Sequence, residues 1–293
     1  MLRVLCVAMV FLRLLSYLPF PVLYLISDFL FFVSYRVVRY RKKVIRRNLK
    51  NSFPDKSEKE LRQIEKNFYR HLCDYGVETL KLLTISKAEL TKRMQFANTE
   101  LLAKFKANNQ SIFFLASHQF NWEWMLVSAS LVFPFDIEFV YQPVKNKFFD
   151  RFSLATRSRF GALGIRRKDV AREIIKRRNK LKGLASVADQ YPGYDSDKKY
   201  ATRFLNQDTV FFYGTNQLAQ LTQFPTLYYK VEKVRRGYYL STPVIIGEPP
   251  YDKTSDAVIE GYVRELEKSI QQNPANYLWS HNRWKKRHLR AET

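Results

Sequence analysis

Cysteine, glycine and histidine are all scarce in this chain, and each scarcity excludes a class of site. The two cysteines among 293 residues, Cys6 and Cys73, support neither a disulfide framework nor a cysteine-based zinc site. They fit a reducing, cytoplasm-facing location. The nine glycines form no phosphate-binding loop and no dinucleotide fingerprint. Because only four histidines are present, a catalytic imidazole has few candidates.

Acidic residues are also few relative to basic ones. The chain has 27 acidic and 50 basic residues, which gives a formal net charge of +23. This excess predicts a polyanionic partner, whether nucleic acid, an anionic membrane or an acidic substrate. The hydrophobic fraction of 46% excludes disorder as the class of the chain, and the length allows one or two domains.

No uninterrupted apolar run is long enough for an ordinary membrane-spanning helix, which needs about 18 to 20 residues. Residues 1–35 are apolar and aromatic, but they are interrupted by Arg3, Arg13, Pro19, Pro21 and Asp28. No small-residue cleavage signature follows, so a removable signal peptide is not expected. The segment predicts two short helices bent at the prolines, or a single imperfect span. A buried helical pair in a soluble protein is the alternative.

A basic run follows this apolar segment directly. From residue 36 to residue 50 there are eight basic residues and no acid: Arg36, Arg39, Arg41, Lys42, Lys43, Arg46, Arg47 and Lys50. A polybasic run beside an apolar segment is typical of a cytoplasmic membrane face. A nucleic-acid patch is the alternative, but no helix-turn-helix, zinc-finger or RNA-binding motif accompanies the run. We therefore expect residues 1–50 to attach the chain to a membrane.

The remaining residues, 51–293, alternate helical patterns with short apolar runs that are typical of buried strands. A capping box at Ser57 and Glu60 marks one helix, and Ser86 and Glu89 predict a second capped helix. A further helix is expected over residues 148–160, ending at Gly161, and a hairpin is predicted around Arg235, Arg236 and Gly237. This alternation predicts one α/β domain with a mixed central sheet flanked by helices, preceded by an apolar helical attachment at the N-terminus.

The stretch from Ser111 to Val132 holds the strongest candidate site. Its apolar run predicts a buried strand that ends just before His118, and Asn121 is a good N-cap for the helix that follows. Ligands bind at the carboxyl ends of strands in open α/β sheets. Across such a turn, the carboxylate of Glu123 can fold back onto the imidazole, giving a base and the group that orients it. A surface or capping arrangement is the structural alternative.

Other candidates lie at similar places in the predicted fold. Arg157 and Arg159 belong to a basic concentration that is mostly a solvated helix face, and these two are the better candidates for pointing inward. Asp189 and Gln190 follow the short strand predicted at residues 184–188, at its carboxyl edge. Asp189 could equally cap a turn.

These residues form blocks that resemble the lipid A biosynthesis late acyltransferases (lauroyl and myristoyl transferases) of the lysophospholipid acyltransferase superfamily. His118 to Glu123 is similar to the superfamily's H-x4-D/E motif, with the glutamate of that branch. The other four blocks follow in the family's order: Tyr40-Arg41 through Asn48-Leu49 to Ser52-Phe53-Pro54; Arg159-Phe160-Gly161; Ala188 to Gly193; and the closing Y-x-W-x-H-x-R-W-K from Tyr277 to Lys285.

The resemblance implies a membrane-associated O-acyltransferase with a lysophospholipid acyltransferase-like fold. His118 would be the general base for an acceptor hydroxyl, and Glu123 would support it. The donor would be acyl-acyl carrier protein, an acidic co-substrate, and no cofactor or metal is implied. Arg159 would contact the anionic acceptor, while Asp189 and Gln190 would shape the acceptor side of the cleft. For Arg157, which lies outside the matching block, a substrate contact and a surface charge are equal alternatives.

The resemblance further implies a lipid A precursor as acceptor and the cytoplasmic face of a bacterial inner membrane as location. A lysophospholipid or an amino-acid-containing lipid is the alternative acceptor for the same chemistry. A basic membrane-binding or nucleic-acid-binding protein without turnover is the non-enzyme alternative. It leaves the placement of His118 and Glu123 unexplained, so we expect no nucleic-acid partner.

Overall fold

The computed structural model describes the backbone of residues 2–193 and 196–284, and side chains from residue 7 onward within these ranges. Its centre is a mixed seven-stranded sheet with the strand order β1-β9-β8-β2-β5-β3-β4. The strands are β1 (Met94–Phe96), β2 (Ile112–Ala116), β3 (Asp136–Tyr141), β4 (Leu163–Arg166), β5 (Lys182–Val187), β8 (Thr226–Arg235) and β9 (Tyr238–Gly247). All neighbours are parallel except β8 and β9. The predicted α/β fold with a mixed sheet is confirmed.

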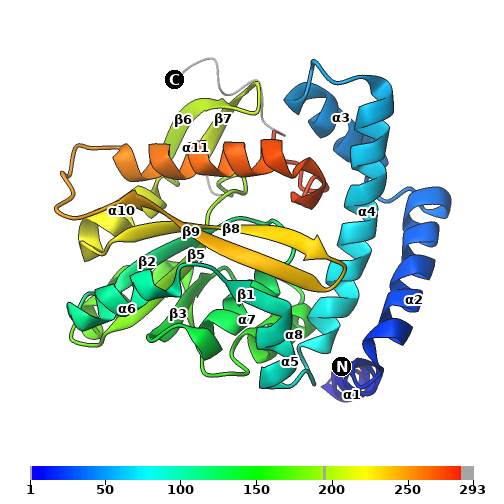
Figure 1. The fold of residues 1–293 in the computed structure, drawn as a ribbon, viewed down its shortest axis with the longest axis horizontal. Helices are drawn as coiled ribbons and strands as arrows, with labels where there is room; N and C mark the ends of the chain where they lie inside the picture. The colour runs from blue at the N-terminus through cyan, green and yellow to red at the C-terminus, as the bar shows by residue number, and fades with distance from the viewer. Residues whose placement is uncertain (1, 194–195, 285–293) are drawn as a thin grey trace.

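Helices cover both faces of this sheet (Figure 1). On one face lies α11 (Ala257–Gln272), and on the other lie α5 (Lys87–Arg93), α6 (Thr99–Ala107), α7 (Trp122–Val132) and α8 (Lys147–Arg157). Smaller elements around the sheet are α9 (Val170–Lys176), α10 (Gly214–Thr222), the 3-10 turns η2 (Arg167–Asp169) and η3 (Pro274–Asn276), and the antiparallel pair β6 (Lys199–Phe204) and β7 (Gln207–Phe212).

Strand β2 occupies the middle of the sheet, between β5 and β8, and all five of its residues are buried. Phe113 and Leu115 point into one hydrophobic cluster, and Ile112, Phe114 and Ala116 point into the other. Since both faces of this strand are covered, its sequence is a continuous apolar run rather than an alternating one. The predicted strand and the N-cap of α7 at Asn121, whose side chain accepts from the Trp124 amide, are both confirmed.

Helix α4 (Glu58–Lys81) is the longest helix described and joins the N-terminal helices to the sheet domain. It begins with the predicted capping box, in which Ser57 and Glu60 satisfy each other's backbone amides. Figure 1 shows α4 running along one edge of the molecule, with α2 beside it on the outside and the sheet domain on its inner side.

The N-terminal segment forms α1 (Leu2–Ser16), α2 (Phe20–Phe32) and the π-helical turn η1 (Val33–Val37), followed by α3 (Lys42–Ser52). The bend predicted at the prolines separates α1 from α2. Helix α2 continues through η1, so Phe20–Val37 is long and apolar enough to cross a membrane by length and composition. Leu23 and Ser27 are the buried residues of α2, while Leu25 and Phe29 remain exposed. An outward apolar face of this kind is compatible with lipid contact.

One predicted helix differs in length from the structure. The helix expected over residues 148–160 ends at Arg157, and a turn carries the chain through Ser158 and Arg159 to Gly161. Gly161 has φ +103°, a conformation that side chains rarely adopt. The sequence therefore identified the terminating glycine, but the helix stops one turn before it.

Candidate active site

The turn between β2 and α7 carries His118. β2 ends at Ala116, and α7 begins at Trp122, so the imidazole stands at the carboxyl edge of the central strand and next to a helix N-terminus. Its side chain is 20% exposed, and its ring meets Trp122 edge-on with 5.0 Å between ring centroids. This is the predicted place for a ligand-facing group in an α/β sheet.

Asp189 holds the inner side of the His118 ring. Its carboxylate accepts a hydrogen bond from His118 Nδ1 at 2.7 Å and another from the His118 amide at 3.2 Å. The pairing arises because β5 lies next to β2 in parallel, which brings the residues after both strands to the same edge. Burial by itself would raise the pKa of Asp189, but attraction to His118 and these hydrogen bonds outweigh burial and hold the pKa below its usual value.

The other ring nitrogen faces Gln190 and a cavity. When Nδ1 donates its proton to Asp189, His118 Nε2 becomes an acceptor. The Gln190 side-chain nitrogen lies 3.3 Å from Nε2 and can donate to it. Both residues line the cavity described below, so a substrate hydroxyl could replace the Gln190 amide at Nε2. The arrangement therefore presents one basic nitrogen to bound substrate and anchors the other.

In the described part of the chain Glu123 makes no hydrogen bond to the imidazole, so the carboxylate does not fold back onto the ring as expected. The charge of His118 still acts on Glu123, since it is among the causes that lower the pKa of this carboxyl. The Glu123 carboxylate instead accepts two hydrogen bonds from Arg157, at 2.8 Å from Nε and 2.6 Å from Nη2. The Trp122 indole donates to the same carboxylate at 3.1 Å. The planar guanidinium group of arginine matches a carboxylate in this bidentate way. Arg157 lies 34 residues after Glu123 in the chain.

This buried ion pair shifts the pKa values of both partners. Burial would raise the pKa of Glu123, but the charge and hydrogen bonds of Arg157 lower it below the usual value. For Arg157, burial would lower the pKa, and the charge and hydrogen bonds of Glu123 raise it instead. Both groups therefore remain charged. Glu123 reaches His118 through the Trp122 indole, whose ring packs against the imidazole.

An apolar cavity of about 440 Å³ opens at His118 and runs between β2, α7, β3 and α8. Its apolar lining comes from Phe114, Ala116, Trp122, Met125, Leu126, Phe139, Val140, Leu154, Ala185 and Val187. Arg157 also lines the cavity. It is connected to Trp122, which packs against the imidazole, because Glu123 accepts hydrogen bonds from both Arg157 and the Trp122 indole. Polar side chains share the lining, among them His118, Gln142, Asp150 and Gln190. A mainly apolar cavity that also holds polar groups suits an apolar chain with a reactive head.

Arg159, by contrast, is not among the residues that line this cavity. Its Nη1 donates to the Leu82 carbonyl at 2.6 Å, and its guanidinium lies over the Phe160 ring. Leu82 follows the end of α4, where free carbonyls attract cations. The structure thus brings together His118, Asp189, Gln190, Glu123 and Arg157, and it leaves Arg159 outside that group.

Residues at the start of the closing block and just before it form backbone hydrogen bonds with the β2–α7 turn. The Leu278 amide donates to the His118 carbonyl at 3.1 Å, and the Phe120 amide donates to the Asn276 carbonyl at 3.0 Å. His281 Nε2 accepts from the Tyr191 amide, and the buried Arg283 donates to the Val210 carbonyl. These contacts join the closing block to the β2–α7 turn and to β7. Lys285 lies outside the described residues.

Within residues 2–193 and 196–284, no group of three or more His, Cys, Asp or Glu side chains is placed to hold a metal ion. The partnership of Asp189 with His118 was missed by sequence reasoning, although both had been placed at strand ends. The available signal was the strand-end position itself, which needs the strand order before it identifies a pair.

A profile of the bacterial lipid A biosynthesis acyltransferases matches residues 2–286, nearly the whole chain. The chain belongs to the bacterial lipid A biosynthesis acyltransferase family. The resemblance inferred from the sequence blocks is thereby confirmed, and with it the assignment as an acyltransferase. No curated protein sequence matches the chain at a significant level. The family assignment favours turnover over the alternative of a basic binding protein without catalysis.

Proposed function

We propose that this acyltransferase moves a fatty acyl group from acyl-acyl carrier protein to a hydroxyl of a lipid A precursor, with His118 as the general base. The observation that carries the proposal is the orientation of the His118 ring. Nδ1 is anchored on the buried Asp189, while the ring lines an apolar cavity beside Gln190. An imidazole that is anchored at Nδ1 and presents Nε2 to a cavity, where a substrate hydroxyl can replace the Gln190 amide, is the arrangement that proton abstraction requires.

The proposed reaction needs no covalent acyl-enzyme. His118 Nε2 takes the proton from the acceptor hydroxyl as the hydroxyl oxygen attacks the thioester carbonyl carbon. The carbon–sulfur bond then breaks, the acceptor keeps the acyl group as an ester, and the leaving thiolate receives the proton from Nε2. The imidazolium that forms between these steps is stabilised by the Asp189 carboxylate at 2.7 Å.

The apolar cavity would hold the acyl chain, and each methylene buried there contributes about 0.8 kcal/mol to binding. Arg157 is a positively charged residue that lines this cavity. Two of its N–H groups donate hydrogen bonds to Glu123. A guanidinium has five N–H donors, so others are available to a substrate carbonyl or phosphate. In this proposal Arg157, rather than Arg159, contacts substrate, and Gln190 contributes the acceptor side.

The location we propose is the cytoplasmic face of a bacterial inner membrane, with residues 1–50 as the attachment and residues 51–293 as the acyltransferase domain. The helix Phe20–Val37 is apolar, and a basic hollow of about 490 Å³ lies between its C-terminal end and α4. The hollow is lined by Tyr35, Arg36, Lys59, Arg62, Gln63 and Lys66. Cations beside the end of a membrane helix favour anionic lipid headgroups.

Membrane fractionation tests this location. If α2 is inserted in lipid, the protein is expected to stay in the membrane pellet after an alkaline carbonate wash that removes peripheral proteins. The apolar residues that α2 exposes, among them Leu25 and Phe29, supply the physical reason. Recovery of most of the protein in the supernatant would contradict insertion of α2.

The donor that the family resemblance implies, acyl carrier protein, is acidic. A chain of net charge +23 would attract it electrostatically. The donor and acceptor are tested together by a transfer reaction with labelled acyl-acyl carrier protein. Lipid A precursor and lysophospholipids would be offered separately and then in competition. Transfer to the lipid A precursor supports the proposal, and transfer confined to lysophospholipids would replace the proposed acceptor while keeping the chemistry.

A further inference from the structure

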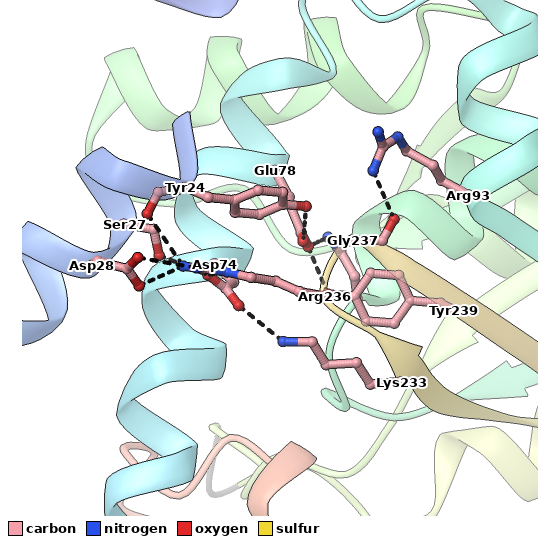
Figure 2. Close-up of polar contacts among 11 residues, drawn as sticks. Tyr24, Ser27, Asp28, Asp74, Glu78, Arg93, Lys233, Arg236, Gly237 and Tyr239 are labelled. Atoms are coloured by element: carbon pink, nitrogen blue, oxygen red, sulfur yellow. Dashed lines mark hydrogen bonds and ion pairs between the residues drawn. The ribbon is translucent and has the colours of Figure 1, made fainter. Parts of the chain in front are cut away.

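Glu78 is a fully buried carboxylate of α4 that the proposed reaction does not use. It accepts hydrogen bonds from three different elements: Tyr24 Oη of α2 at 3.0 Å, Asn121 Nδ2 at 2.8 Å and Tyr239 Oη of β9 at 2.7 Å. Figure 2 shows the Tyr24 hydroxyl reaching this carboxylate from α2. Among the described residues, no Lys or Arg forms an ion pair with Glu78, so hydroxyl and amide donors alone satisfy it.

Asn121 connects this carboxylate to the active-site turn. It is fully buried, follows His118 by three residues and caps α7 by accepting the Trp124 amide at 3.0 Å. Glu78 holds the other end of the same side-chain amide, and its own backbone carbonyl accepts from the Trp124 indole at 2.8 Å. The orientation of the capping side chain is therefore set by Glu78.

The opposite side of the turn is held by a separate set of contacts. The buried Gln119 side-chain oxygen accepts from Ser117, Tyr228 and Ser269 at 2.9 to 3.0 Å. His118 thus stands on a turn that is fixed at Gln119 from the α11 side and at Asn121 from the α4 side. Loss of either set would free the turn to move relative to the cavity.

We propose that Glu78 is a positioning residue for His118: it fixes the turn through Asn121 and links it to the docked α2 helix through Tyr24. The proposal rests on the role of His118 in the proposed function. Burial raises the pKa of Glu78 to about 7, although attraction to Lys233 and the bond from Tyr239 act in the opposite direction. An apolar residue would avoid this burial cost, but it would leave the Asn121 amide and two hydroxyls without their partner.

Asp74 supplies a matched control, because it lies one helical turn before Glu78 and also ties α2 to the sheet domain (Figure 2). Its carboxylate binds Ser27 of α2 at 2.8 Å, and Lys233 and Arg236 of the β8–β9 hairpin at 2.7 to 2.9 Å. Among the residues that the structure describes, none of its hydrogen bonds or ion pairs reaches the β2–α7 turn. A change at Asp74 therefore disturbs the docking of α2 without acting on Asn121 directly.

The test compares acyl transfer by folded, membrane-reconstituted enzyme in four variants. Asn121→Asp keeps the cap but sets a second carboxylate against Glu78, and kcat is expected to fall at least ~10-fold with little change in KM, since small displacements of a base cost this much. Adding Glu78→Gln restores a donor opposite the new carboxylate, so the double variant Glu78→Gln/Asn121→Asp is expected to recover most of kcat. Glu78→Ala should lose kcat, whereas Asp74→Asn should lower thermal stability and keep kcat.

Recovery in the double variant is the outcome that a general structural role would not produce. The proposal is overturned if Asn121→Asp transfers acyl groups like wild type, or if the double variant is no better than the single one. Equal kcat losses in Asp74→Asn and Glu78→Ala would also overturn it, because docking of α2 alone would then explain the effect. These failures are distinguishable from failure of the proposed function, which would show as normal transfer by His118→Ala.

Discussion

Asp189→Asn is expected to lower kcat for acyl transfer by about 10- to 100-fold while leaving KM nearly unchanged. The Asp189 carboxylate lies 2.7 Å from His118 Nδ1 and is 1% exposed. It stabilises the imidazolium that exists only after Nε2 has taken a proton. Asparagine keeps an oxygen that can accept from Nδ1, but it lacks the charge that makes a hydrogen bond to an ionised group worth about 1.5 to 3 kcal/mol. Since this interaction strengthens in the transition state, the loss should appear in kcat.

The measurement is steady-state kinetics with acyl-acyl carrier protein, normalised to folded enzyme. Asp136→Asn is the matched control. It removes the same charge at the first residue of β3, where the side chain is exposed. It should transfer acyl groups like wild type. A normal kcat for Asp189→Asn would mean that the carboxylate only holds the ring, and that the Asn side chain can replace it.

Glu123→Ala is expected to destabilise the fold by about 3 to 5 kcal/mol and to lower kcat at least ~100-fold. Loss of the carboxylate leaves the Arg157 guanidinium, 24% exposed, without its bidentate partner, and breaking a buried ion pair costs this much. The Trp122 indole loses its acceptor as well, so the ring packed against His118 is released. Denaturant unfolding measures the first effect, and transfer assays on folded enzyme measure the second.

A double variant separates these two effects. Glu123→Leu combined with Arg157→Met replaces the ion pair by apolar side chains, which is often neutral for stability. It should therefore unfold close to wild type and still lack acyl transfer. If this double variant regains full activity, Glu123 and Arg157 serve the fold alone, and their part in the proposed chemistry is wrong.

The central strand and its helix were predictable from the sequence because their signals are local. The apolar run of β2 and the capping side chain of Asn121 specify strand, turn and helix within about 20 residues. The hairpin around Gly237 was predictable for the same reason, since a turn signal joins two alternating segments. The place of His118 followed directly from these elements.

The partners of His118 and Glu123 were not predictable, because they depend on which elements become neighbours. Asp189 reaches the imidazole only because β5 pairs with β2, and Arg157 reaches Glu123 only because α8 packs against α7. Arg159 stands two residues after Arg157, beyond the helix end, and points to the Leu82 carbonyl instead. Spacing along the chain could not distinguish these two arginines.

Composition alone could not show that part of the run of residues 36–50 binds other parts of the same chain. Arg41 donates to the Ser280 carbonyl at 2.9 Å, and Asn48 donates to the Trp279 and His281 carbonyls at 2.9 Å. Arg46 pairs with the buried Glu65 at 2.8 Å. Part of the run therefore binds the closing block behind the active site. This contact holds the early block against the closing block.

The most direct measurement is acyl transfer from labelled acyl-acyl carrier protein to the lipid A precursor by wild type and His118→Ala. A general base contributes about 10²- to 10⁴-fold, so the variant is expected to lose at least ~100-fold in kcat. The side chain is 20% exposed at the cavity, so the protein should remain folded. If folded His118→Ala transfers acyl groups at the wild-type rate, His118 is not the base, and the proposed mechanism is wrong.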